Sequence, residues 1–149
     1  ITKGLSKIRY KLKDCLYMGN IDSERDWGHA RDYVEMQWRM LQQEKAEDYV
    51  IATGIQASVR DFIELSAVKL GWGGIEWKGK GIDEIGIRID TGKTVIKISP
   101  KYFRPAEVET LLGDARKAHS KLGWKPTTTL NQLVEEMIDF DLKQERMNL

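Results

Sequence analysis

The 149-residue chain lacks the residues that build disulfide-linked or zinc-stabilised folds. Its one cysteine, Cys15, cannot form an internal disulfide, and His29 and His119 alone leave too few ligands to favour a structural zinc site. No apolar run approaches the ~18 residues that a transmembrane helix requires, and no segment has a secretory pattern. We therefore expect no metal site and no association with a membrane, and a location in the cytoplasm.

An excess of one charge is also missing. Twenty-four Lys and Arg residues oppose 23 Asp and Glu residues, which leaves a formal net charge of +1. Because nucleic-acid-binding domains normally carry a basic excess, this balance predicts no nucleic-acid partner. The apolar share of 41% and the charged share of 32% are typical of a globular protein, and the length suits one domain, so residues 1–149 are expected to form a single unit.

Two signatures of nucleotide and redox chemistry are absent. The segment Gly79-Lys80-Gly81 begins like the dinucleotide-binding pattern G-x-G-x-x-G, but Glu84 occupies the place of the third glycine. No Walker sequence occurs, and none of the five tyrosines has a lysine four positions later, so a Tyr-x-x-x-Lys acid/base pair cannot be built. The glycines of residues 72–93 therefore predict turns between short strands, and residues 79–97 are expected to form a loop and an edge strand.

Apolar periodicity predicts helices that alternate with short strands. Helices are expected over residues 1–13, 29–43, 58–69, 114–122 and 129–138, strands over residues 15–18, 49–52, 75–77 and 95–98, and a polar loop over residues 22–28. These elements predict an α/β protein, or α+β if the strands do not join one parallel sheet.

Local signals refine these helices. Ser58 with Asp61, and Thr129 with Gln132, have the spacing of a capping box. In the helix over residues 29–43 the apolar spacing predicts one core-facing stripe, made by Tyr33, Val34, Trp38 and Leu41.

Arg25 is the first candidate binding residue. It follows an expected strand and precedes an expected helix, and α/β proteins often place ligand contacts at such strand ends. A guanidinium there suits a phosphate, which it binds through two parallel donors. Spacing alone leaves a second interpretation open, in which Arg25 forms a surface ion pair with Glu24 or Asp26.

Arg104 and Glu107 form a second candidate pair, in a segment stiffened by Pro100 and Pro105. Stiffening lowers the entropic cost of presenting side chains to a ligand. Arg104 suits a phosphate, whereas Glu107, which only accepts hydrogen bonds when ionised, suits ribose hydroxyls or the N–H edge of a purine. An intramolecular ion pair between Arg104 and Glu107 is equally compatible with the spacing.

Together these segments resemble the carboxyl-terminal half of the GDP-mannose 4,6-dehydratases, a branch of the extended short-chain dehydrogenase/reductase family. The resemblance is carried in the same order by MGNIDSERDWGHARDYV (residues 18–34), WRMLQQE (38–44), DYVIATG (48–54), SVR (58–60), YFRPAEVETLLGD (102–114), KAH (117–119) and KLGWKP (121–126). A co-linear series of motifs over nearly the whole chain is far more specific than any one of them.

The resemblance implies both a fold and an activity. The fold would be an α/β fragment, mostly the smaller substrate-binding domain of helices and short strands, and the amino-terminal Rossmann part would be absent. Enzymes of this family use NADP to oxidise GDP-mannose, eliminate water and return the hydride, which yields GDP-4-dehydro-6-deoxy-mannose. Since the missing half would bind NADP and supply the catalytic residues, we carry over no catalytic or cofactor residue and expect the fragment alone to be inactive.

The resemblance also assigns binding residues. It makes Arg25 and Arg104 contacts of the diphosphate and Glu107 a contact of the guanosine, with Gly19 and Asn20 as further candidate nucleotide contacts. GDP-mannose is the implied ligand, and a homo-oligomer, either a dimer or a tetramer, is the implied assembly. The first residue is not methionine, which suits a cut through a longer protein. A non-catalytic nucleotide-sugar-binding module and a related nucleotide-sugar epimerase or dehydratase remain alternatives.

Overall fold

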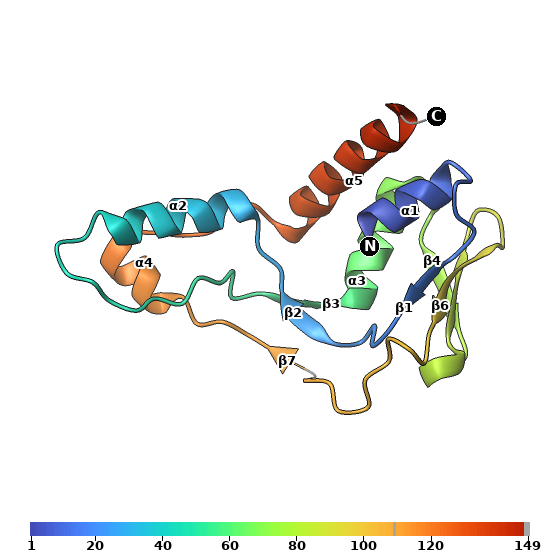
Figure 1. Ribbon diagram of the computed structural model, residues 1–149, viewed down its shortest axis with the longest axis horizontal. Helices are drawn as coiled ribbons and strands as arrows, with labels where there is room; N and C mark the ends of the chain where they lie inside the picture. Colours follow the sequence, from blue (N-terminus) through green and yellow to red (C-terminus); the bar gives the residue numbers. More distant parts are fainter. Residues whose placement is uncertain (109, 148–149) are drawn as a thin grey trace.

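The computed structural model describes residues 1–108 and 110–147, and helices and strands alternate along it (Figure 1). The helices are α1 (Thr2–Arg9), α2 (Ala30–Leu41), α3 (Val59–Lys69), the 3-10 helix η1 (Gly81–Asp83), α4 (Arg116–Leu122) and α5 (Leu130–Met147). The strands are β1 (Leu16–Met18), β2 (Glu24–Asp26), β3 (Gln56–Ser58), β4 (Ile75–Lys78), β5 (Ile85–Arg88), β6 (Thr94–Ile98) and β7 (Thr110–Leu111). The α-helices confirm those expected from the sequence, although α1 ends earlier and α5 continues further.

Local capping sets several helix boundaries. Ser58 Oγ accepts a hydrogen bond from the Asp61 N–H at 3.0 Å, and the Asp61 carboxylate accepts one from the Ser58 N–H at 2.8 Å, so the predicted capping box begins α3. Thr129 and Gln132 bond reciprocally in the same way before α5. Helix α4 ends at Gly123, whose φ of +60° is a conformation that glycine adopts without a steric penalty.

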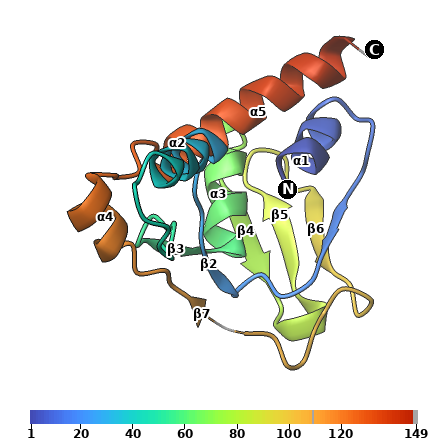
Figure 2. The same cartoon turned by 60° about the vertical axis from the view of Figure 1, so that its left-hand side comes forward.

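A mixed four-stranded sheet supports the larger core. Its strand order is β1-β6-β5-β4, in which β1 runs parallel to β6 and the other neighbours are antiparallel. Helices α1, α3 and α5 lie together on one side of this sheet (Figure 2). The most deeply buried apolar side chains of this core are Leu5, Ile63, Ala67, Trp72, Val95, Ile96, Val134 and Ile138. Helices interspersed with strands along the chain confirm the α/β class.

The expectation of a loop and an edge strand for residues 79–97 is wrong for β5. This strand lies inside the sheet, between β6 and β4, and η1 occupies the turn before it. The charges and glycines of the segment are not typical of a strand, so the sequence did not indicate one. Gly86 lies within β5 because Trp77 and Ile96 pack so closely there that little room remains for a side chain.

The polar loop expected over residues 22–28 contains strand β2, so that expectation is also wrong. Strand β2 is the middle strand of a second sheet, antiparallel to β3 and parallel to β7. Arg25 lies opposite Ala57 of β3 and Leu111 of β7. Strand formation here depends on partners far along the chain, which a local composition of charged residues does not indicate.

Residues 49–52 do not form the strand that their apolar character predicts. They are not in a helix or a strand, and they pair with no strand among the described residues. A strand exists only where a neighbour bonds its backbone groups, so apolar composition alone was insufficient.

The face of α2 that packs inward also differs from the expected one. Met36 is fully buried, and Ala118 of α4 and Trp124 complete a small second core around it. Val34, Trp38 and Leu41, which the periodicity placed inward, are instead 60%, 61% and 81% exposed. Helix α2 thus turns one apolar stripe to α4 and leaves another uncovered in the described part of the chain.

Asp32 joins α2 to the segment that leads into α5. It is 2% exposed, and its carboxylate accepts hydrogen bonds from the Thr127 hydroxyl at 2.7 Å and from the Thr128 N–H at 2.9 Å. The indole of Trp124 donates to the Asp32 carbonyl at 2.9 Å. Burial by itself would raise the pKa of Asp32, but the bonds from Thr127 and Thr128 outweigh it and hold the pKa below its ordinary value of 3.8.

Because a lowered carboxyl pKa stabilises the folded state only while the group is ionised, Asp32 should contribute stability above pH 3.8 that is lost as the pH falls further. Asp32→Asn keeps the shape but turns one acceptor into a donor that faces other donors. We expect it to lower the free energy of unfolding at neutral pH by about 2 kcal/mol, measured by urea titration. The exposed Asp83→Asn is the matched control and should change it by less than about 0.5 kcal/mol. Equal stability of the two variants would contradict this role.

Candidate functional site

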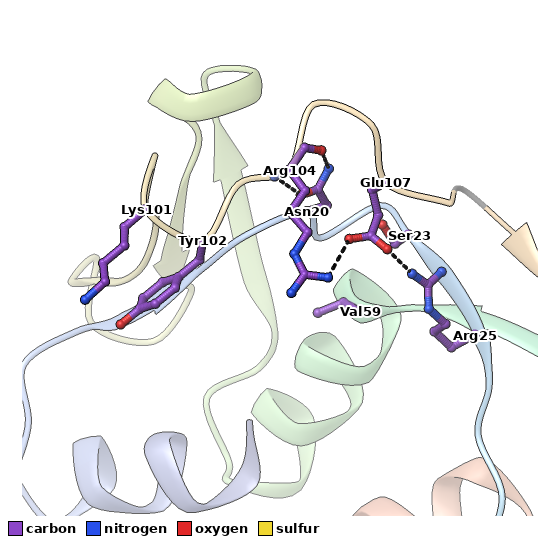
Figure 3. A pocket seen from close by; sticks show the side chains of 8 residues that line it. All are labelled: Asn20, Ser23, Arg25, Val59, Lys101, Tyr102, Arg104 and Glu107. Atoms are coloured by element: carbon purple, nitrogen blue, oxygen red, sulfur yellow. Dashed lines mark hydrogen bonds and ion pairs between the residues drawn. The ribbon is translucent and has the colours of Figure 1, made fainter.

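The structure joins the three charged residues singled out in the sequence. Arg25 Nη2 lies 2.6 Å from Glu107 Oε1, and Arg104 Nη1 lies 3.7 Å from Glu107 Oε2 (Figure 3). One carboxylate therefore lies between two guanidinium groups that are 79 residues apart in the chain (104 − 25). The ion pair between Arg104 and Glu107, left open by the spacing, is present, whereas Arg25 pairs with Glu107 rather than with the side chains of its sequence neighbours.

Strand β2 positions Arg25 at this site. Pairing with β3 and β7 fixes its backbone, and its Nη1 donates to the carbonyls of Glu24 at 2.7 Å and Val108 at 2.9 Å. The guanidinium is thus anchored through one nitrogen while the other faces Glu107. Arg104 is held less tightly, since its side chain is 78% exposed.

Asn20 positions the backbone of Arg104. Its Nδ2 donates to the Arg104 carbonyl at 2.9 Å, and its Oδ1 accepts from the Arg104 N–H at 2.8 Å, so the side chain bonds that residue as a strand would. The preceding Gly19 lies so close to Tyr102 that a Cβ there would overlap the Tyr102 carbonyl oxygen. Both residues, expected to contact a nucleotide, hold the Arg104 loop against the chain, and Asn20 also lines the pocket described next.

A pocket of about 360 Å³ contains both arginines (Figure 3). It is lined by Asn20, Ser23, Arg25, Val59, Lys101, Tyr102, Arg104 and Glu107. Arg25 and Arg104 therefore share one cavity rather than lying on opposite faces of the molecule. Two guanidiniums in a cavity of this size suit a ligand with two adjacent anionic groups.

Four pocket residues were not selected from the sequence. Ser23 and Val59 come from the segments before β2 and at the start of α3, and Lys101 and Tyr102 precede Arg104. Only Lys101 carried a usable signal, because it is a cation in the same proline-bounded segment. Ser23 and Val59 gave none, since only the tertiary structure brings them here.

Arg60 braces the wall beside this pocket and was also missed. Its guanidinium bonds Asp22 at 2.7 Å and the carboxylate of Glu84 at 2.7 and 3.1 Å, and it stacks on the ring of Trp77 at 4.5 Å. The bond to Glu84 raises the pKa of Arg60, so the group stays charged. This network links the segment before β2 to the β4–β5 connection. In the sequence Arg60 appeared only within the SVR motif, which gave no indication that Asp22 and Glu84 would bind it.

The glycine pair that begins like a dinucleotide-binding motif does not have the structure of one, and the described residues contain no cluster of metal ligands. Gly79 and Gly81 lie in the connection between β4 and β5, followed by a single 3-10 turn rather than a helix whose N-terminus could receive a pyrophosphate. Within residues 1–108 and 110–147, no three His, Cys, Asp or Glu side chains cluster as metal ligands, and no helix is long and apolar enough to cross a membrane.

Solved structures define the class of fold. The structure of RMD from Pseudomonas aeruginosa complexed with NADPH superposes with a TM-score of 0.74 at 21% identity, over 96% of this chain and 41% of that one. The dTDP-glucose 4,6-dehydratase from Bacillus anthracis in complex with NAD superposes with a TM-score of 0.70 at 18% identity, over 98% of this chain and 40% of that one. The chain thus has part of the fold of the short-chain dehydrogenase/reductase-type epimerases and dehydratases.

Sequence similarity identifies the family. Residues 1–137 match the family described as GDP-mannose 4,6 dehydratase. The chain is 54% identical over 153 aligned residues to the GDP-mannose 4,6-dehydratase of Vibrio cholerae, covering 96% of this chain and 41% of that protein. It is 45% identical over 148 residues to the human GDP-mannose 4,6 dehydratase, covering 99% of this chain and 40% of that protein. The chain belongs to the GDP-mannose 4,6-dehydratase family and spans about 40% of the length of these relatives.

Asn20→Ala removes both hydrogen bonds that hold the Arg104 backbone. At ~0.5–1.5 kcal/mol per bond, we expect the free energy of unfolding to fall by about 1–3 kcal/mol, measured by urea titration. Asn131→Ala, at an exposed asparagine of α5, is the matched control and should change it by less than about 0.5 kcal/mol. Equal stability of the two variants would show that the Arg104 backbone is held by other contacts.

Proposed function

We propose that the chain is the nucleotide-sugar-binding part of a GDP-mannose 4,6-dehydratase, which converts GDP-mannose to GDP-4-dehydro-6-deoxy-mannose. The observation that carries this proposal is the shared pocket of Arg25 and Arg104. A nucleotide sugar has a diphosphate with two negative charges at its centre, and two guanidiniums match it in charge and in hydrogen-bond geometry. The close relationship to named dehydratases selects this activity among the nucleotide-sugar enzymes that share the fold.

The proposal assigns distinct tasks to the chain's own residues. Arg25, anchored on β2, would fix the diphosphate, and the more exposed Arg104 would close on it from the opposite loop. Glu107 would accept hydrogen bonds from the guanosine. Gly19 and Asn20 line the pockets and would also contact the nucleotide, while Asn20 holds the loop that carries Arg104. These residues bind and orient the substrate, and none of them is proposed to move a proton or hydride.

The redox step would depend on NADP bound by another part of the complete polypeptide, since the sequence contains no G-x-G-x-x-G motif for this cofactor. Two features of the described chain support such a part. The apolar stripe of α2 (Val34, Trp38 and Leu41) is exposed, and the apolar residues 49–52 have no strand partner among the described residues. An additional sheet and its helices would cover the first and pair the second. A cytoplasmic location and assembly into a homo-oligomer belong to the same proposal.

The direct test is an activity assay. The complete polypeptide, given GDP-mannose and NADP, should form the 4-keto sugar nucleotide, detected by mass spectrometry as the loss of one water. Residues 1–149 alone should form none, because the sequence contains neither a G-x-G-x-x-G motif for the cofactor nor a Tyr-x-x-x-Lys pair. Keto product from residues 1–149 alone would refute this division of labour. Unchanged GDP-mannose with the complete polypeptide would refute the dehydratase assignment.

Substituting either arginine separately tests the binding site. Arg25→Ala and Arg104→Ala should each weaken GDP binding about 10- to 100-fold, because each removes charge-assisted bonds worth ~1.5–3 kcal/mol. Calorimetry with guanosine should show little change in either variant, since guanosine lacks the diphosphate. Arg116→Ala removes a guanidinium that is 91% exposed and pairs only with Asp114 in the described structure, and it serves as the control. Equal losses for GDP and guanosine would indicate a general disruption of the site.

A further inference from the structure

Glu107 occupies the place that an anionic ligand would take. Its Oε1 is 2.6 Å from Arg25 Nη2 and its Oε2 is 3.7 Å from Arg104 Nη1, so each oxygen faces one of the two guanidiniums (Figure 3). The other terminal nitrogen of Arg25, Nη1, already bonds the carbonyls of Glu24 and Val108. A diphosphate that enters the pocket therefore competes with this carboxylate for the same donors.

Displacing the carboxylate has a free-energy cost that depends on what replaces its partners. The Glu107 side chain is only 21% exposed, so water solvates it incompletely once it leaves the arginines. A partly buried charge without a partner is destabilising. A ligand made of phosphate alone offers no donor to the released carboxylate, whereas a nucleoside offers ribose hydroxyls and base N–H groups.

Glu107 lies at the boundary between two neighbouring cavities, so its side chain can reach a ligand in either of them. Besides the pocket of the two arginines, Glu107 lines an adjoining pocket of about 720 Å³, and Asn20 and Ser23 are also shared by both. A ligand whose diphosphate lies in the first pocket could thus extend its nucleoside into the second. The carboxylate would then turn from the arginines toward the nucleoside without leaving the boundary between the two.

We propose that Glu107 is a placeholder anion that the diphosphate displaces, and that its release selects nucleoside diphosphates over free diphosphate. The proposal rests on the proposed function, because it takes the two arginines to be the diphosphate site. In the empty protein the carboxylate holds the Arg25 guanidinium in place and keeps simple anions out. In the complex it exchanges two cationic partners for donors of the nucleoside, so binding of the diphosphate is coupled to recognition of the nucleoside.

Glu107→Gln tests this coupling, since it removes the charge and nearly preserves the shape. With the competing anion gone, inorganic diphosphate should bind about five- to tenfold more tightly, and the preference for GDP over diphosphate should fall about tenfold or more. Both affinities are measured by calorimetry on the complete polypeptide in magnesium-free buffer. Glu44→Gln is the matched control, because Glu44 is exposed, lines neither of the two pockets and forms no ion pair within the described residues. It should change each affinity less than about twofold.

A double-mutant cycle separates competition from a general change in charge. In an Arg25→Gln background, Glu107→Gln should alter diphosphate affinity less than about twofold, because most of the contested cation has gone. Unchanged or weaker diphosphate binding in Glu107→Gln, or the same gain in both backgrounds, would overturn the placeholder role. Failure of the proposed function is a different result, namely no binding of GDP and no keto-sugar product with the wild type.

Discussion

The site depends on the contact between residues 19–26 and residues 102–111, two segments more than 70 positions apart. Asn20 bonds the backbone of Arg104 from both sides, and β2 pairs with β7 next to it. Without this contact Arg25 and Arg104 would lie on separate loops with no pocket between them. The two side-chain bonds of Asn20 and the short β2–β7 pairing are individually weak. The position of Arg25 therefore also depends on the pairing of β2 with β3, which leads directly into the capped start of α3.

The arginines of this region are neutralised by nearby carboxylates. Glu107 forms ion pairs with Arg25 and Arg104, while Glu84 and Asp22 form ion pairs with Arg60 on the neighbouring wall. The two groups differ in exposure and therefore in what they can do. Arg60 is locked between two carboxylates and an indole, which suits a brace, whereas the highly exposed Arg104 at 3.7 Å from its partner is free to change partners. A rigid wall beside an adjustable cation suits a site that closes on a ligand.

Local rules predicted the elements whose stabilising contacts lie within a few residues. The capping boxes at Ser58 and Thr129 are set by bonds across three positions, and both were predicted correctly. The failures have the opposite cause. Strand β2 is charged and β5 contains a glycine at its centre, so each becomes a strand only because distant neighbours pair with it. The prediction of the inward face of α2 was wrong for a related reason. The helix carries two apolar stripes, and Trp124, which is distant in sequence, packs only against the one that contains Met36.

The amino-acid sequence by itself determined the helices, their caps, the α/β class, the family resemblance and the residue types suited to a diphosphate. These follow from short-range hydrogen bonding, from periodicity and from motif order, all of which are written along the chain. Only the tertiary structure decided that Arg25, Arg104 and Glu107 meet in one pocket, where one carboxylate forms an ion pair with each guanidinium. The support that Gly19 and Asn20 give to the Arg104 loop was likewise visible only in the structure. Those are distances between side chains remote in sequence, and packing and strand pairing across the whole fold set them.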